Sequence, residues 1–228
     1  MLNRFYYLQH DLPGHEPVTP GGITIAHVLD GHAGAATAAL THQYSADGNY
    51  PFCLMLRDVP DAAAALKQSL LFFFHPQYEM TAKGRPVFIF GQAAAGTRTQ
   101  IERLLETQGL EAEVIFARSD AGDPVITLDA NDPEAADAYY RYCLTGYRPE
   151  DIFLLSGGGL AAWQRQLGRV DARLAESHPD FYRLAQERLS AAQLAAERGR
   201  EIGRLNEELA ITNQLLDLSN RHDEVDYI

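Results

Sequence analysis

The sequence predicts an α/β fold with a mostly parallel sheet, followed by a long helical extension. An uninterrupted apolar run at residues 87–90 is typical of a strand buried on both faces. Helical spacing of Ile101, Leu104 and Leu105 follows it, and a second apolar run comes at 114–116. Because a helix connects the two runs, their strands should be parallel. No strand pattern remains after residue 160, where the composition becomes that of long helices.

Further apolar runs, bounded by turn-forming residues, predict the other strands. They lie at residues 5–8, 23–29, 52–56, 125–128 and 152–155. Alanine-rich segments at 33–44 and after Asp61 predict helices between the early strands. A helix is also expected after Asn131, where a capping side chain precedes Pro133.

The helical extension divides at residues 177–180, which contain Pro179. A 3-4 spacing can be followed from Phe181 onward, and it forms a regular heptad seam from Ile202 to Leu216. A helix of some forty residues would be about 60 Å long, too long to bury such a stripe against a small domain. We therefore expect it to pair with a second copy or with another protein. The alternative is a hairpin that folds back on residues 160–176. The predicted organisation is an α/β domain at 1–158 and a helical tail at 159–228, with a coiled coil from about 181.

Composition excludes several classes of partner. A formal net charge of -12 argues against nucleic acid, which normally needs a basic stripe. The longest apolar run, at 70–74, is far shorter than the roughly 20 residues of a membrane span, and the N-terminus lacks a signal-peptide core. Cys53 and Cys143 lie in apolar surroundings and read as buried thiols, so we expect a cytoplasmic protein.

Glycines follow several of the predicted strands. Glycine between a strand and a helix can turn backbone N–H groups toward a phosphate at the helix N-terminus. Gly91, Gly96, Gly157 and Gly158 are therefore candidates for holding the diphosphate of a nucleotide-sugar, although none belongs to a full fingerprint. Tight turns explain the same glycines without a ligand.

Three polar residues are candidates for chemistry on a sugar. Asp58 follows a strand, where glycosidases place their carboxylates, but it also suits a helix cap. His10 ends a strand, and His75 precedes a proline next to an apolar run, so either could line a cleft. The histidine pairs near the N-terminus are spaced poorly for metal ligands, and we expect no metal and no bound cofactor.

Three segments, in this order, resemble the WbsX-like proteins of bacterial surface-polysaccharide clusters, whose domain is similar to glycoside hydrolase family 99. Residues 5–10, Phe-Tyr-Tyr-Leu-Gln-His, resemble the opening strand of the family, and 51–54, Pro-Phe-Cys-Leu, match a later strand. Residues 76–90 are similar to a segment that ends in Gly-Lys-Pro-Val-Phe and an apolar strand. The resemblance covers about half of the chain.

The chain also departs from that family at the positions where its glutamates stand. Met55-Leu56-Arg57-Asp58 replaces a Trp-Ala-Asn-Glu segment, and 156–159, Ser-Gly-Gly-Gly, replaces an Asn-Glu-Trp-Ala-Glu segment. An eight-unit barrel needs about 200 to 250 residues, whereas about 160 precede the tail. The resemblance therefore implies a contracted or incomplete (β/α) barrel without the catalytic glutamates.

We expect a non-catalytic or strongly diverged glycan-related domain of a polysaccharide (O-antigen type) biosynthesis protein, with a coiled-coil tail for assembly. One alternative is an active glycosyltransferase that binds a nucleotide-sugar at the glycine-ended strands. The other is a purely structural oligomerisation module. The sequence does not decide whether the chain is an enzyme, or which glycan it meets.

Overall fold

The computed structural model describes residues 1–10, 22–30, 53–57, 64, 66–67, 87–91, 97–109, 112–117 and 125–225. Within them lies one sheet in which every neighbouring pair of strands is parallel. Its strands are β1 (Arg4–Gln9), β2 (Ile23–Asp30), β3 (Cys53–Arg57), β4 (Val87–Phe90), β5 (Glu113–Phe116), β6 (Val125–Asp129) and β7 (Ile152–Ser156). Each apolar run predicted to be a strand contributes one, and the four residues of β4 are all buried.

The strand order is that of a barrel cut open between β5 and β6. Along the sheet the strands run β5-β4-β3-β2-β1-β7-β6. The steps from β1 through to β5 all go toward the same edge of the sheet. The steps from β6 to β7 and from β7 to its neighbour β1 go in that same direction. In a flat sheet β1 and β5 would be about 19 Å apart, because neighbouring strands are about 4.8 Å apart. Arg4 of β1 nevertheless forms an ion pair with Glu113 of β5. The sheet is therefore curled into a half-barrel, and the prediction of a contracted or incomplete (β/α) barrel is confirmed.

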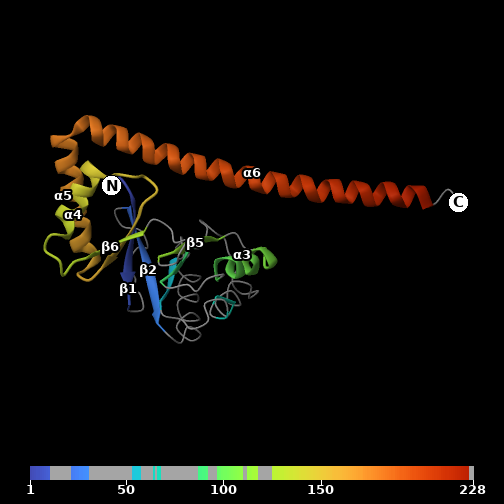
Figure 1. Ribbon diagram of the computed structural model, residues 1–228, viewed down its shortest axis with the longest axis horizontal. Coiled ribbons are helices and arrows are strands. Elements are labelled where there is room, and N and C mark those ends of the chain that lie inside the picture. The colour runs from blue at the N-terminus through green and yellow to red at the C-terminus, as the bar shows by residue number, and fades with distance from the viewer. Residues whose placement is uncertain are drawn as a thin grey trace.

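In the described part of the chain four longer helices accompany the sheet: α3 (Thr97–Thr107), α4 (Ala135–Thr145), α5 (Leu160–Ser177) and α6 (Pro179–Val225). The helix expected between the two apolar runs is α3, and it buries Ile101 and Leu105 as its spacing predicts. Helices α4 and α5 lie side by side at one end of the sheet (Figure 1), where their apolar faces share a core with β1 and β7. We call the sheet with α3, α4 and α5 the α/β body.

Helix α5 belongs to the core of the body. It buries Trp163, Leu167, Val170 and Leu174, which recur at helical spacing on one face. The indole N–H of Trp163 donates to the carbonyl oxygen of Gly157 at 3.1 Å, so the start of the helix is fixed to the end of β7. The helix ends at Ser177, and Pro179 opens the next one, as the predicted break requires.

Helix α6 begins on the body and then leaves it. Phe181, Tyr182 and Ala185 pack in the same core as α5, and the hydroxyl proton of Tyr147 is shared between the carbonyl oxygens of Leu2 (2.8 Å) and Ala185 (3.1 Å). Beyond this anchor α6 runs straight out past the body (Figure 1). It does not fold back along 160–176. None of the helices in the described part of the chain is long and apolar enough to cross a membrane.

Candidate functional site

The inner face of the curled sheet is filled by its own side chains. Alternate residues of the strands point to this face and form one apolar cluster. Its members are Tyr6, Leu8, Ala26, Val28, Cys53, Met55, Val87, Ile89, Ile115, Ile152 and Leu154. Burial raises the pKa of the Cys53 thiol, and burial next to the Glu113 carboxylate raises that of the Tyr6 hydroxyl. The described interior therefore resembles the packed core of a barrel, with both groups uncharged at neutral pH.

A cavity of about 490 Å³ lies at the N-terminal edge of the sheet, under α6. The paired side chains of Arg4 and Glu113 line its sheet side, and Leu189 and Gln193 of α6 line the other. In barrel enzymes the catalytic residues sit at the opposite edge, on the loops that follow the strands. The side chains of Glu150 and Glu197 line the cavity as well, and its position between α6 and the sheet fits a joint between the two.

At the C-terminal edge, the glycines after β7 are required by packing. Gly157 and Gly158 have φ angles of 67° and 59°, a conformation that favours glycine. A β-carbon on Gly157 would lie 2.7 Å from the Oδ1 atom of Asp129, and one on Gly158 would lie 2.8 Å from the β-carbon of Ala130. The hydroxyl of Tyr7 donates to the carbonyl oxygen of Gly158 at 2.9 Å. These contacts make a tight turn against the end of β6.

The same turn leads into the N-terminus of α5, where a phosphate could in principle be held. The N-cap residue Gly159 offers no side-chain hydrogen bond to the helix. The Asp129 carboxylate, however, lies against Gly157 and accepts a hydrogen bond from the N–H of Asn131 at 2.9 Å. Because a carboxylate at this distance repels an anion, the geometry favours a turn over a phosphate site here.

The other residues predicted for the site do not come together. His10 is exposed directly after β1. Gly91 follows β4, which is separated from β7 by three strands in the sheet order, and its N–H donates to the carbonyl oxygen of Leu56 at 3.0 Å. Asp58, His75 and Gly96 lie outside the described residues.

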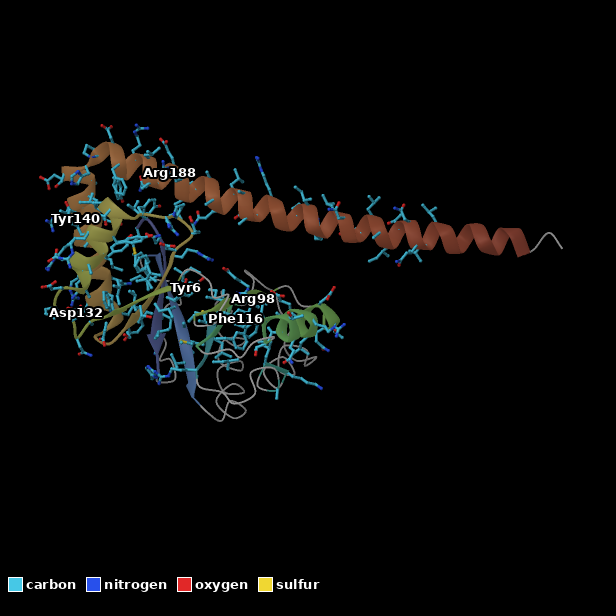
Figure 2. The ribbon with its side chains drawn as sticks, in the orientation of Figure 1. Tyr6, Arg98, Phe116, Asp132, Tyr140 and Arg188 are labelled. Carbon is cyan, nitrogen blue, oxygen red and sulfur yellow. The ribbon has the colours of Figure 1, made fainter. Side chains whose placement is uncertain are left out.

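Two further polar groups of the body serve the fold. Burial lowers the pKa of His27 on β2 to about 4, so its imidazole is neutral at physiological pH. Arg98 on α3 lies over the ring of Phe116, 4.3 Å from its centroid (Figure 2). Among the described residues no group of three or more histidine, cysteine, aspartate or glutamate side chains could hold a metal ion.

A row of exposed apolar side chains lies on α6. Its distal seam, defined as Ile202, Leu205, Leu209, Thr212 and Leu216, is exposed throughout. The exposed fractions of Ile202, Leu205 and Leu209 are 59%, 48% and 59%. Ile211 and Leu215 are equally exposed but lie on other faces of the helix. Contiguous exposed apolar side chains of this kind are typical of interaction surfaces.

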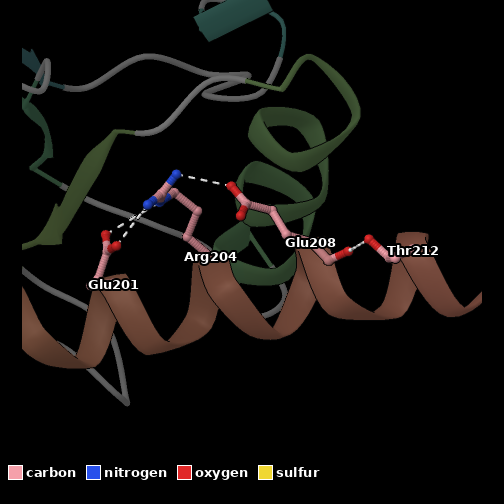
Figure 3. A network of polar contacts seen from close by, with 4 residues as sticks. All are labelled: Glu201, Arg204, Glu208 and Thr212. Atoms are coloured by element: carbon pink, nitrogen blue, oxygen red, sulfur yellow. Dashed lines mark hydrogen bonds and ion pairs between the residues drawn. The ribbon is translucent and has the colours of Figure 1, made fainter.

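A polar network borders the distal seam. Arg204 bonds to Glu201 at 2.6 Å and to Glu208 at 2.9 Å, and the hydroxyl of Thr212 donates to the carbonyl oxygen of Glu208 at 2.8 Å (Figure 3). The hydrogen bonds from Arg204 lower the pKa of Glu201. We did not single out this network from the sequence, although the i, i+3 and i, i+4 spacing of its charges could have indicated it.

The ion pair of Arg4 and Glu113 has no such local signal, because its members are 109 residues apart. Only the curled sheet brings them together.

Comparisons of the chain with protein-family models, with curated proteins and with solved structures find no match. The resemblance to WbsX-like proteins therefore stays a prediction from the sequence.

Proposed function

We propose that this chain is a non-catalytic, strongly diverged relative of glycan-processing barrels that works in surface-polysaccharide biosynthesis, with α6 as its assembly element. A cytoplasmic location is part of the proposal. The observation that carries it is the contrast between an inner sheet face filled by apolar side chains and a helix whose apolar seam is uncovered. Such a molecule is better equipped to hold or organise than to cleave.

The strand order supports the glycan part of the proposal. The curled sheet advances in one direction from β6 through β1 to β5, as the strands of a (β/α) barrel do. Doubly wound nucleotide-binding sheets instead reverse direction at a switch point, where the ligand binds. Among the described strands the one step in the other direction is from β5 to β6, across the open side of the half-barrel.

The packing of the body supports the absence of glycosidic chemistry. Retaining glycosidases need two carboxylates about 5 Å apart, and inverting ones need a somewhat larger separation. The C-terminal ends of β6 and β7 carry Asp129 and Ser156, and Asp129 is engaged in the turn with Asn131 and Gly157. The glutamate that the family resemblance would place after β7 is replaced by this turn.

A glycosidase assay tests this proposal. The full chain should release no product from a panel of simple aryl glycosides above the rate of buffer. Turnover that disappears in an Asp58→Asn variant, and persists in an Asp132→Asn variant, would overturn the non-catalytic assignment. Asp132 is a suitable control because it is an exposed carboxylate in the turn before α4.

The same protein also tests the glycosyltransferase alternative. A ligand that binds only the native state raises the melting temperature, so a thermal scan detects nucleotide-sugar binding. We expect no shift of the melting temperature with UDP- or GDP-sugars. A shift that is lost in an Asp129→Ala variant would contradict our interpretation that the Gly157 turn holds no ligand.

A further inference from the structure

We propose that α6 joins two copies of this chain in a parallel, two-stranded coiled coil centred on the distal seam. The proposal rests on the assembly role proposed above for α6 and names its partner, a second copy. Three properties of the helix support it: the direction in which the seam faces, the way its one polar member is satisfied, and the residues on its two sides.

The distal seam faces away from the body. The residues of α6 that are buried or half-buried against the body are Phe181, Tyr182, Ala185, Leu189 and Ala192. At about 100° per residue, the centre of the distal seam lies roughly 150° around the axis from the centre of this set. A second helix can therefore pack along the seam without meeting the body. In a parallel pair the two bodies would lie on opposite sides of the paired helices.

The only polar side chain in the distal seam can be buried without losing a hydrogen bond. The hydroxyl of Thr212 already donates to the carbonyl oxygen of Glu208 in its own helix (Figure 3). Its methyl group is then what a partner helix would contact. A buried hydroxyl without a partner would oppose association, so this internal bond removes the main obstacle within the seam.

The residues beside the seam favour a parallel pair of identical helices. With Ile202 and Leu209 at positions a of the heptad, Glu201 and Glu208 occupy positions g, and Asn206 and Asn213 occupy positions e. In a parallel pair, g of one helix faces e of the next heptad on the other, so each glutamate meets an asparagine amide, which is a hydrogen-bond donor.

In an antiparallel pair, g faces g instead. Glu208 would then face another Glu208 or Leu215, and the asparagines would face one another. Because one helix carries both halves of the favourable pairing, a second copy is its natural partner. Most of the flanking positions are polar, with Leu215 as the apolar exception at g, so the seam stays narrow over most of its length, as suits two strands.

The distal seam is about 22 Å long, just over two heptads, so the association should depend on concentration. Analytical ultracentrifugation of the full chain should show a monomer–dimer equilibrium. Leu209→Lys should weaken the dimer by about a hundredfold or more, because it places a charge in the seam of both helices.

Ile211→Lys is the matched control. Ile211 is 57% exposed, against 59% for Leu209, but it lies off the seam. This variant should dimerise like the parent chain. A parent chain that stays monomeric at the highest concentrations reached, a larger oligomer, or equal weakening by both variants would overturn the proposal. The melting temperature of the body should be the same in both variants, which excludes misfolding as the cause.

Cysteine cross-linking tests the orientation. Cys53 and Cys143 are buried, so a new thiol on α6 should react alone under mild oxidation. Ile202→Cys chains should form disulfide-linked dimers with one another, because residue 202 meets its own copy only in a parallel pair. If instead Ile202→Cys chains cross-link only with Thr212→Cys chains, the pair is antiparallel, because position a then faces position d, and the proposal is wrong. Ile211→Cys serves as the control away from the seam.

These outcomes are separate from those of the proposed function. Glycoside turnover would remove the non-catalytic assignment and leave the dimer intact. A monomeric chain without turnover would remove the second copy as partner, and the assembly role of α6 would then require a different protein.

Discussion

Trp163 and Leu167 on α5 are fully buried, whereas Leu209 and Leu216 on the distal half of α6 are 59% and 55% exposed. Both helices repeat apolar residues along one face at helical spacing, so composition alone does not separate them. Helix α5 has the outer face of the sheet to cover, and α6 runs past the end of the body (Figure 1). The difference is that the body covers the apolar face of α5 and leaves the distal seam of α6 exposed, which is why we propose a second copy as the partner of the seam.

The largest difference between the two helices is expected when a leucine is truncated to alanine in each of them. Leu167→Ala removes a fully buried side chain and should lower the free energy of unfolding of the body by about 2–5 kcal/mol. Leu209→Ala should change it by less than about 0.5 kcal/mol, because the residue lies off the body. Urea unfolding at low protein concentration, followed by fluorescence of the only tryptophan, Trp163, measures both. Equal effects would mean that the seam supports the body.

A second test uses pH, because the body buries a titratable group, the imidazole of His27, whereas the distal half of α6 is exposed. The pKa of His27 is lowered to about 4 from an ordinary value near 6.5. The unfolded chain therefore takes up a proton first as the pH falls, and stability should decrease between pH 6.5 and 4 by up to about 3 kcal/mol. His27→Gln should flatten this part of the pH profile of unfolding.

The control for the pH test is His178→Gln, since His178 is exposed between α5 and α6. This variant should keep the full slope of the parent chain. If the slope were unchanged in His27→Gln, a group other than His27 would account for the loss of stability at acid pH.

The third comparison concerns two glycines of the body. Gly157→Ala puts an alanine into a left-handed backbone conformation and places its β-carbon 2.7 Å from the Oδ1 atom of Asp129. The variant should therefore destabilise the body by about 1–3 kcal/mol. Gly168→Ala, inside α5 with no atom within 4 Å of the new carbon, should stabilise it by about 0.5–1 kcal/mol. Thermal melts of the two variants should move in opposite directions. If both were neutral, the turn after β7 would be looser than described.

The sequence predicted the strands, the parallel β4-α3-β5 unit and the long α6, because these follow from local periodicity and from helical connections. It did not predict the contact between Arg4 and Glu113, which exists only once the sheet curls. The glycine turn after β7 was recognised, but its partner Asp129 was not, because that contact joins two strands. Predictions that depend on Asp58, His75 and Gly96 lie outside the described residues.

The smallest effect on stability is expected at Arg204, on the exposed distal half of α6. Arg204→Ala removes the bridge to Glu201 and Glu208, and the melting temperature of the helical signal should fall by less than about 2 °C, as is usual for exposed pairs. Arg204→Lys keeps the positive charge, so its melting temperature should fall less than that of Arg204→Ala. Because the hydrogen bonds from Arg204 lower the pKa of Glu201, the difference should be present at neutral pH and should be lost only as the pH falls below the ordinary range of a glutamate carboxyl, where Glu201 becomes protonated. One molar salt should also remove it, since screening then acts within about 3 Å. A difference that survives both conditions would mean that Arg204 acts through packing, which would place it in the interface with the second copy.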